Sequence, residues 1–244
     1  MKKRFLLLLA IGFFFLSMAG PVNAALTIIG TAQFDGEGEN YNLIWDDDNN
    51  GNSVIWLDYI NPDAAWSVQM TWAAGLKSSL TYNIDPAAYT VTWGEDGWRL
   101  PRTVDSSEYT EGDDGSTLAG YNITSSEMGH LYYEELENLG MYDTSGVEPS
   151  GWGLENTGDF NNLVKNYYWS ATEHAGDMDT AWNFDMNDGG QFPYDKGSLE
   201  YEDFGLALRN GYVSEVPVPG AIWLFGPGLA GMAAFARRRK GSRG

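Results

Sequence analysis

Residues 167–190 have the sequence YYWSATEHAGDMDTAWNFDMNDGG, and this stretch decides the fold class. Two runs rich in aromatic or β-branched residues, 167–170 and 180–186, are separated and followed by Gly, Asn and Asp. Such runs, bounded by turn-forming residues, are typical of short strands joined by turns. We therefore predict two strands here and a third of the same kind at 204–210.

The segments before this stretch add further strands. Residues 25–33 alternate weakly between apolar and polar side chains, which predicts an edge strand. Residues 41–45 and 53–56 predict two short strands on either side of an acidic loop. The body of the chain is therefore expected to be rich in short strands.

Two helices are also predicted. Apolar residues recur through 64–76 without a helix breaker. A second helix is predicted over 124–140, where Ser125 and Ser126 can cap its start and Gly140 stops it. Few helices, short strands and long polar loops together predict one α+β domain of short antiparallel strands and about two helices, with any binding function in the loops.

The N-terminus has the three parts of a signal peptide. A basic head at residues 2–4 precedes an apolar run over 5–15, and small residues end the segment at Ala24. A short membrane anchor is the alternative, but the apolar run is short for a span of about 20 residues. We expect residues 1–24 to direct export through the inner membrane.

The C-terminus predicts a transmembrane helix. Residues 216–236 contain no charged side chain and are followed by a basic cluster at 237–240. At about 1.5 Å per residue such a helix just spans a hydrocarbon core. A buried core helix is the alternative, but the basic cluster fits an anchor on the cytoplasmic side. Both ends thus place the body outside the cytoplasm.

The order of parts at this end resembles the PEP-CTERM sorting signal. The residues that carry the resemblance are Val216, Pro217, Val218, Pro219, Arg237, Arg238 and Arg239. The resemblance covers 216–241, after a linker at 212–215. It implies an exosortase, a membrane-embedded cysteine protease, that reads the short motif and releases or transfers the body to the cell surface.

Composition limits the chemistry of the body. The chain has no cysteine, which excludes disulfides, a thiolate nucleophile and a cysteine metal site. Eight of the 14 basic residues lie in the two ends, and all 34 acidic residues lie between them. Nucleic acid is therefore not an expected partner, because phosphate binding needs basic residues. The abundant aromatic residues predict a folded body, and its acidity suits divalent cations or neutral and cationic partners.

Five short sequence motifs occur in a fixed order between residues 40 and 211. They are 43–45, 98–101, 168–173, 181–184 with 188–190, and 207–209. In this order they resemble the Lcl-C family, the C-terminal domain of the Legionella collagen-like adhesin, with residues 25–39 as a lead-in. The resemblance implies a fold similar to C-type lectins and a non-catalytic, glycan-binding role, since the related oxidase chemistry requires cysteines.

Several residues within these motifs have two interpretations. Trp98, Trp169 and Trp182 either form the core or stack on a ligand, and burial tendencies favour the core. Arg99 and Arg209 are expected to form internal pairs with carboxylates, because a guanidinium group binds two oxygens at once.

A metal site is suggested by Asp46, Asp48, Asn50 and the later Asp58. Oxygen-bearing side chains at alternating positions, followed by Gly51, resemble the start of a calcium loop. The twelfth position holds Leu57 instead of the closing glutamate of an EF-hand, and strands flank the loop. The alternative is a solvated hairpin tip.

A second set of polar residues is the candidate ligand-binding site. Its members are Glu173, Trp182, Asn183, Asp185 and Asp188. Sugar-binding lectins hold calcium with a Trp-Asn-Asp run, which Phe184 interrupts here. No spacing nominates His130, on the second helix, or His174, in a loop, as a catalytic base.

These observations predict an exported, exosortase-sorted protein of the cell surface or extracellular matrix. The expected role is non-catalytic binding of a glycan or exopolysaccharide, with calcium as the candidate cofactor and a transient membrane anchor. The alternative is a structural matrix component that binds other proteins. An exported hydrolase is a third hypothesis, but no carboxylate pair stands out.

Overall fold

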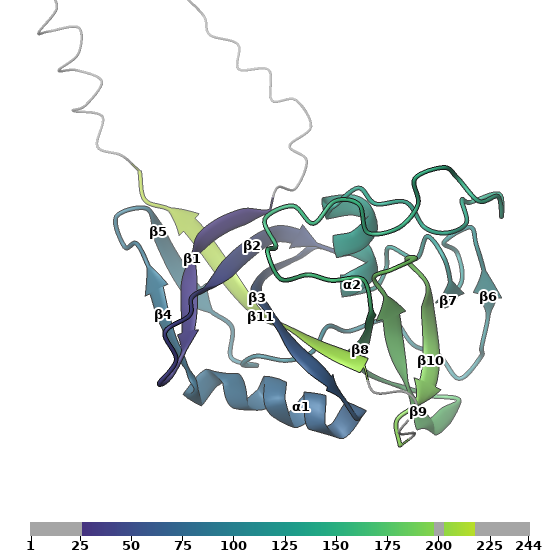
Figure 1. Cartoon of the computed structure of the whole chain (residues 1–244), viewed down its shortest axis with the longest axis horizontal. Coiled ribbons are helices and arrows are strands. Elements are labelled where there is room, and N and C mark those ends of the chain that lie inside the picture. Colours follow the sequence, from purple (N-terminus) through teal and green to yellow (C-terminus); the bar gives the residue numbers. More distant parts are fainter. Residues whose placement is uncertain (1–25, 198–202, 218–244) are drawn as a thin grey trace, which may run out of the picture.

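The chain forms one large mixed β-sheet with two short helices (Figure 1). The structure is a computed structural model that describes residues 26–197 and 203–217. Neighbouring strands follow the order β4-β1-β2-β3-β11-β8-β9-β10-β7-β6, and β5 pairs with β11. Most neighbours are antiparallel, but β11 runs parallel to β8, and β6 runs parallel to β7.

The elements have the following bounds. The strands are β1 Thr27–Phe34, β2 Tyr41–Asn49, β3 Asn52–Ala64, β4 Leu80–Ile84, β5 Tyr89–Trp93, β6 Glu111–Gly112, β7 Ala119–Gly120, β8 Tyr167–His174, β9 Asp177–Asp185, β10 Gln191–Asp195 and β11 Asp203–Glu215. The helical segments are α1 Trp66–Gly75, a 3-10 turn Leu76–Ser78, α2 Glu127–His130 and a π-helical turn Leu131–Glu135.

The predicted fold class, an α+β domain like that of C-type lectins, is wrong. Strands take up 44% of the described residues and helical segments only 12%, so the domain is mostly β. The sheet is larger than expected because β3 and β11 each run for 13 residues. The short strands predicted at 53–56 and 204–210 are parts of these two long strands.

The second helix is shorter than predicted. Ser126 caps it as expected, since its hydroxyl accepts the Gly129 N–H at 2.9 Å. The helical segment ends at Glu135, and Glu137 has a positive φ of 53°, which turns the chain out of the helix well before Gly140. The first helix, predicted over 64–76, is confirmed as α1.

The strand at the N-terminus is present but is not at the edge. β1 lies between β2 and β4, and β4 forms the edge. At the other end of the domain, the predicted linker at 212–215 continues β11 and pairs with β5, for example Tyr212 with Thr92. The sheet thus includes both the expected lead-in and the expected linker.

Two core layers cover the two faces of the central strands. Successive residues of a strand point to opposite faces. On β3, Val54 and Trp56 face the layer that contains α2, whereas Ile55 and Leu57 face the layer that contains Ala73 of α1. Burial on both faces explains why these strands have nearly continuous apolar runs.

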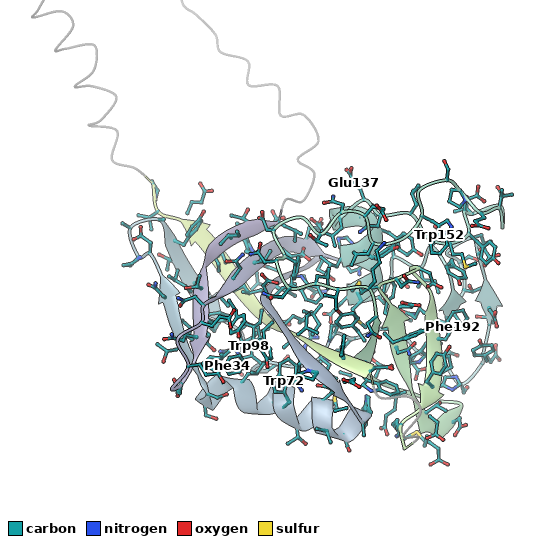
Figure 2. The ribbon with its side chains drawn as sticks, in the orientation of Figure 1. Phe34, Trp72, Trp98, Glu137, Trp152 and Phe192 are labelled. Atoms are coloured by element: carbon teal, nitrogen blue, oxygen red, sulfur yellow. The ribbon has the colours of Figure 1, made fainter. Side chains whose placement is uncertain are left out.

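The three tryptophans of the motifs that resemble the Lcl-C family belong to this core. Trp98 is 2% exposed, and Trp169 and Trp182 are fully buried, which confirms the core interpretation. Figure 2 shows Trp98 with Phe34 and Trp72 on the side of the sheet where α1 lies.

The predicted end segments lie mostly outside the described residues. The signal peptide at 1–24 lies entirely outside them. Of the sorting signal, the structure describes Val216 and Pro217 only. Within residues 26–197 and 203–217, no helix is long and apolar enough to cross a membrane. The predicted C-terminal membrane helix therefore stays a prediction.

Candidate functional site

The β2–β3 hairpin directs two polar side chains, Asp46 and Asn49, into the interior. Asp46 pairs with Val54 and Asn49 with Asn52, so residues 47–48 lie opposite a single residue of β3. This β-bulge shifts the strand alternation by one residue, and positions 46 and 49 point to the same side. Both side chains are 0% exposed, whereas the two bulged aspartates are exposed.

A π-helical turn brings His130 and Glu135 together on the facing helical segment. In an α-helix, residues five apart lie about 140° apart around the axis, because each residue advances by about 100°. Here Leu136 N–H donates to the Leu131 carbonyl at 2.9 Å, an i→i+5 bond that widens the turn. His130 Nε2 and Glu135 Oε1 consequently lie 3.3 Å apart.

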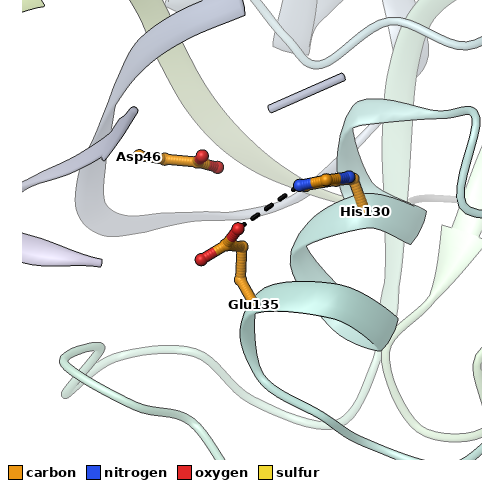
Figure 3. Close-up of side chains that lie close together, drawn as sticks. All are labelled: Asp46, His130 and Glu135. Carbon is orange, nitrogen blue, oxygen red and sulfur yellow. Dashed lines mark hydrogen bonds and ion pairs between the residues drawn. The ribbon is translucent and has the colours of Figure 1, made fainter. Parts of the chain in front are cut away.

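Asp46 lies opposite this pair (Figure 3). Ligand atoms of Asp46, His130 and Glu135 all lie within 4.8 Å of one another. Two donors hold the Asp46 carboxylate: Asn49 Nδ2 and Trp56 Nε1 lie 2.8 and 3.1 Å from Oδ2. We call Asp46, Asn49, His130 and Glu135 the buried cluster.

Three oxygens of the buried cluster have no hydrogen-bond partner. They are Asp46 Oδ1, Asn49 Oδ1 and Glu135 Oε2, and each is buried. A buried oxygen without a partner costs on the order of 1–3 kcal/mol, and more when it is charged. The cluster therefore combines strong acceptors with few donors, an arrangement that favours a proton or a cation.

The pKa values of Asp46 and His130 are both raised above their ordinary values. Burial raises the pKa of Asp46 to about 6, against the lowering effect of its two N–H donors. Burial lowers the pKa of His130, but the Glu135 hydrogen bond and the charges of Asp46, Glu135 and Glu134 outweigh burial and raise it. The neighbouring carboxylates thus favour the protonated form of His130, and burial favours the protonated form of Asp46.

The predicted calcium ligands do not converge. Asp48 Oδ1 accepts the Gly51 N–H at 3.0 Å and belongs to the hairpin tip, next to the exposed Asn50. Asp58 lies farther along β3, and of the four predicted ligands only Asp46 belongs to the buried cluster. The bulge is the reason, because it moves Asp48 out of the alternation on which the prediction depended.

Asp58 instead anchors a loop. Its two carboxylate oxygens accept the backbone N–H groups of Asn161 and Asn162 at 2.9 and 3.0 Å. Asn162 Nδ2 returns a bond to the Asp58 carbonyl at 2.8 Å. The buried carboxylate thus fixes the loop at 161–164 against β3.

Three of the predicted ligand-binding residues point into the protein from β9. Trp182 Nε1 donates to Asp105 Oδ1 at 2.8 Å, and Asn183 Nδ2 donates to Asp203 Oδ2 at 2.9 Å. Asp185 is 5% exposed, and its Oδ1 accepts a backbone N–H at 2.7 Å. All three make internal contacts.

The other two candidates lie nearer the surface but also have internal partners. Glu173 forms an ion pair with Lys196, and Asp188 accepts hydrogen bonds from the Tyr121 hydroxyl and the Gly190 N–H. His174, expected in an exposed loop, ends β8 and is 7% exposed. The structure therefore does not bring the five candidates together around a common opening.

Arg99 and Arg209, the two arginines of the motifs that resemble the Lcl-C family, differ in their partners. Arg99 binds Glu127 with both terminal nitrogens, at 2.6 and 2.7 Å, as predicted. Arg209 instead donates to the Gly94 carbonyl at 2.8 Å and lies over the Trp93 ring. The ion pairs found among the described residues do not include Arg209.

An open groove of about 430 Å³ lies at the end of β2 opposite the hairpin tip. We call it the tyrosine groove, and its lining includes Glu39, Tyr41, Tyr59, Asp63, Asn162 and Phe204. Glu39, Asp63 and Asn162 are exposed, and the Tyr59 and Phe204 rings are half-buried. The loop held by Asp58 forms one wall. The groove therefore presents aromatic rings beside carboxylate and amide oxygens.

The sequence pattern did not reveal the groove or most of the buried cluster. Glu135 carries no signal in the sequence, because a regular helix places it about 140° around the axis from His130. Asn49 carries none either, because strict strand alternation points it away from Asp46. The groove residues come from segments more than 100 positions apart, such as Tyr59 and Asn162.

Comparison of the chain with protein-family models, curated proteins and solved structures finds no match. The resemblances to PEP-CTERM and Lcl-C proteins therefore stay predictions from short motifs. The function is therefore inferred from the residues themselves.

Proposed function

We propose that this chain is an exported, non-catalytic binding module of the cell surface or matrix, and that it binds a neutral glycan in the tyrosine groove. The observation that carries the proposal is the composition of the groove. Half-buried rings of Tyr59 and Phe204 lie beside the exposed oxygens of Glu39, Asp63 and Asn162.

These groups match the chemistry of a sugar ring. The negative face of an aromatic ring attracts the weakly positive C–H groups on the flat side of a pyranose. Sugar hydroxyls are donors, and carboxylate and amide oxygens accept from them. An open groove suits a polymer that passes through it, whereas a small metabolite is usually enclosed.

The charge of the protein favours a neutral ligand over an anionic one. The net charge of the full chain is −20, and the acidic residues lie in the body. Such a surface repels an acidic polysaccharide and slows its approach. The carboxylates of the groove itself strengthen this preference.

Export and sorting complete the proposal. The predicted signal peptide delivers the body across the inner membrane, and the predicted exosortase motif at 216–219 releases it from its C-terminal anchor. Mass spectrometry of the surface-released protein tests this part. A C-terminus near Val216 supports processing, and an intact basic cluster at 237–240 contradicts it.

A glycan array probed with the full chain, with and without a chelator, tests the binding function. We expect binding to neutral glycans in both conditions, because the proposed contacts are aromatic rings and hydrogen-bond acceptors of the groove. Absence of binding in both conditions would contradict the proposal. Self-association in the same preparation, without glycan binding, would favour the structural alternative.

A further inference from the structure

We propose that the buried cluster is a binding site for a divalent transition-metal ion of the zinc type. The ligands are Asp46, His130 and Glu135, and Asn49 offers an additional oxygen beside Asp46. The site is distinct from the tyrosine groove, which lies at the other end of β2, and the proposal does not depend on glycan binding.

The first observation is the convergence of three ligand residues from two parts of the chain, the β2–β3 hairpin and the helical segment 127–135. A strand bulge aims Asp46 inward, and a π-helical turn aims His130 and Glu135 at the same place. π-Helical turns are uncommon, and both they and β-bulges are enriched at functional sites. Both irregularities occur here, where they direct side chains to one point.

The second, independent observation is the set of buried oxygens that lack partners. Asp46 and Asn49 are 0% exposed, the Glu135 side chain is 3% exposed, and each has one such oxygen. A single proton satisfies one oxygen at most. A divalent cation satisfies several acceptors at once and neutralises the two carboxylates.

The spacing of the ligand atoms fits a small cation. Two ligands at about 2.0–2.1 Å from a tetrahedral zinc ion lie about 3.3 Å apart. His130 Nε2 and Glu135 Oε1 are 3.3 Å apart, and Asp46 lies within 4.8 Å of both. Metal binding therefore requires the Asp46 carboxylate to approach the pair by at most about 1.5 Å.

The donor set selects the class of ion. Calcium binds six to eight oxygen ligands, whereas this site offers an imidazole nitrogen and few oxygens. Imidazole together with carboxylate suits zinc and its first-row neighbours. The donors to Asp46 Oδ2, Asn49 and Trp56, orient the carboxylate and leave its Oδ1 free. The ion would join the β2–β3 hairpin to the second helix.

Metal analysis of the purified full chain tests the proposal. We expect about one equivalent of zinc after dialysis against zinc, and removal of zinc by a chelator should lower Tm by about 5–10 °C. Calcium should give no comparable shift. A chain that takes up no zinc, or whose Tm responds only to calcium, overturns the proposal.

Variants locate the site. Asp46→Asn, His130→Gln and Glu135→Gln should each weaken zinc affinity at least about tenfold. Asp48→Asn, at the exposed hairpin tip, and His174→Gln, the other histidine, are matched controls that should retain wild-type affinity. Zinc uptake that survives all three cluster substitutions places the ion elsewhere and overturns the assignment. Should one variant fail to fold, the other two and the wild-type titration still decide.

Discussion

Asp203 is a buried carboxyl group whose ionisation opposes folding. Burial raises its pKa to about 6, although the hydrogen bond from Asn183 acts in the other direction. The folded chain thus holds the proton more tightly than the unfolded chain, where an aspartate has a pKa near 3.9. The stability that this group contributes is present in full below that value and is lost as pH rises through about 6.

Lowering the pH from 7 to 5 should therefore raise the free energy of unfolding by about 1 kcal/mol through Asp203 alone. Asp203→Asn should remove this part of the pH dependence. Urea unfolding at both pH values measures it, with Asp47→Asn on the exposed bulge as the control. If the free energy of unfolding of Asp203→Asn changed between pH 7 and pH 5 as much as that of the wild type, the assignment would be contradicted.

Arg99 and Glu127 form a two-bond pair that links the segment before α2 to its first turn. Both side chains are at most 12% exposed, and Glu127 Oε2 also accepts the Arg102 N–H at 2.6 Å. Removal of the guanidinium group leaves a largely buried carboxylate with fewer partners, which is strongly destabilising.

We predict that Arg99→Ala lowers the free energy of unfolding by about 3 kcal/mol. Arg99→Lys should recover only part of this loss, because an ammonium group cannot make both bonds in the same geometry. Chemical denaturation of the two variants measures the difference. A lysine variant as stable as the wild type would show that charge alone is sufficient.

Residue identity predicted some of these contacts and not others. The Arg99 pair could be predicted because a guanidinium group binds two carboxylate oxygens at once and the body is rich in carboxylates. The partner of Arg209 did not, because a backbone carbonyl and a Trp93 ring leave no sequence signal. The environment of Asp46 depends on a bulge one residue further along β2, which composition does not reveal.

At the scale of elements, the β2–β3 hairpin depends on its two-residue turn. Asn50 and Gly51 have φ values of 53° and 80°, so both central residues are left-handed. This turn matches the twist of the flanking strands and favours Asn-Gly. The turn fixes the register that places Asp46 and Asn49 inside.

Gly51→Ala should therefore destabilise the chain by about 1 kcal/mol, since a side chain is strained at positive φ. Gly75→Ala is the matched control. Gly75 ends α1 with a φ of −76° and has open space around a new methyl group, so alanine there should be neutral or stabilising. Thermal unfolding compares the two. An equal loss of thermal stability in both variants would contradict the turn geometry.

Some runs of aromatic or β-branched residues were predicted as strands, and one such run was missed. Runs such as 167–170 and 180–186 coincide with β8 and β9. The run missed is β5, whose sequence YTVTW alternates half-buried and exposed residues and so indicates a strand by itself. Only its pairing with β11, a contact distant in sequence, could not be inferred. The π-helical turn also could not be inferred, because its residues suit an ordinary helix.

At the scale of the whole molecule, one sheet joins the two proposed sites at opposite ends of β2. The sequence predicted a β-rich, acidic, exported body but misjudged the fold class, since the extent of a sheet depends on long-range pairing. The acidic surface and the mixed lining of the tyrosine groove together support a neutral glycan as the ligand.

A calorimetric titration of the full chain with a neutral glycan identified on the array tests this central claim most directly. We predict saturable binding that Asp63→Ala and Tyr59→Leu each weaken at least about tenfold, and that Asp47→Ala, at the opposite end of β2, leaves unchanged. An acidic polysaccharide should not bind. Wild-type affinity in both groove variants, or preferential binding of the acidic polymer, would contradict the account.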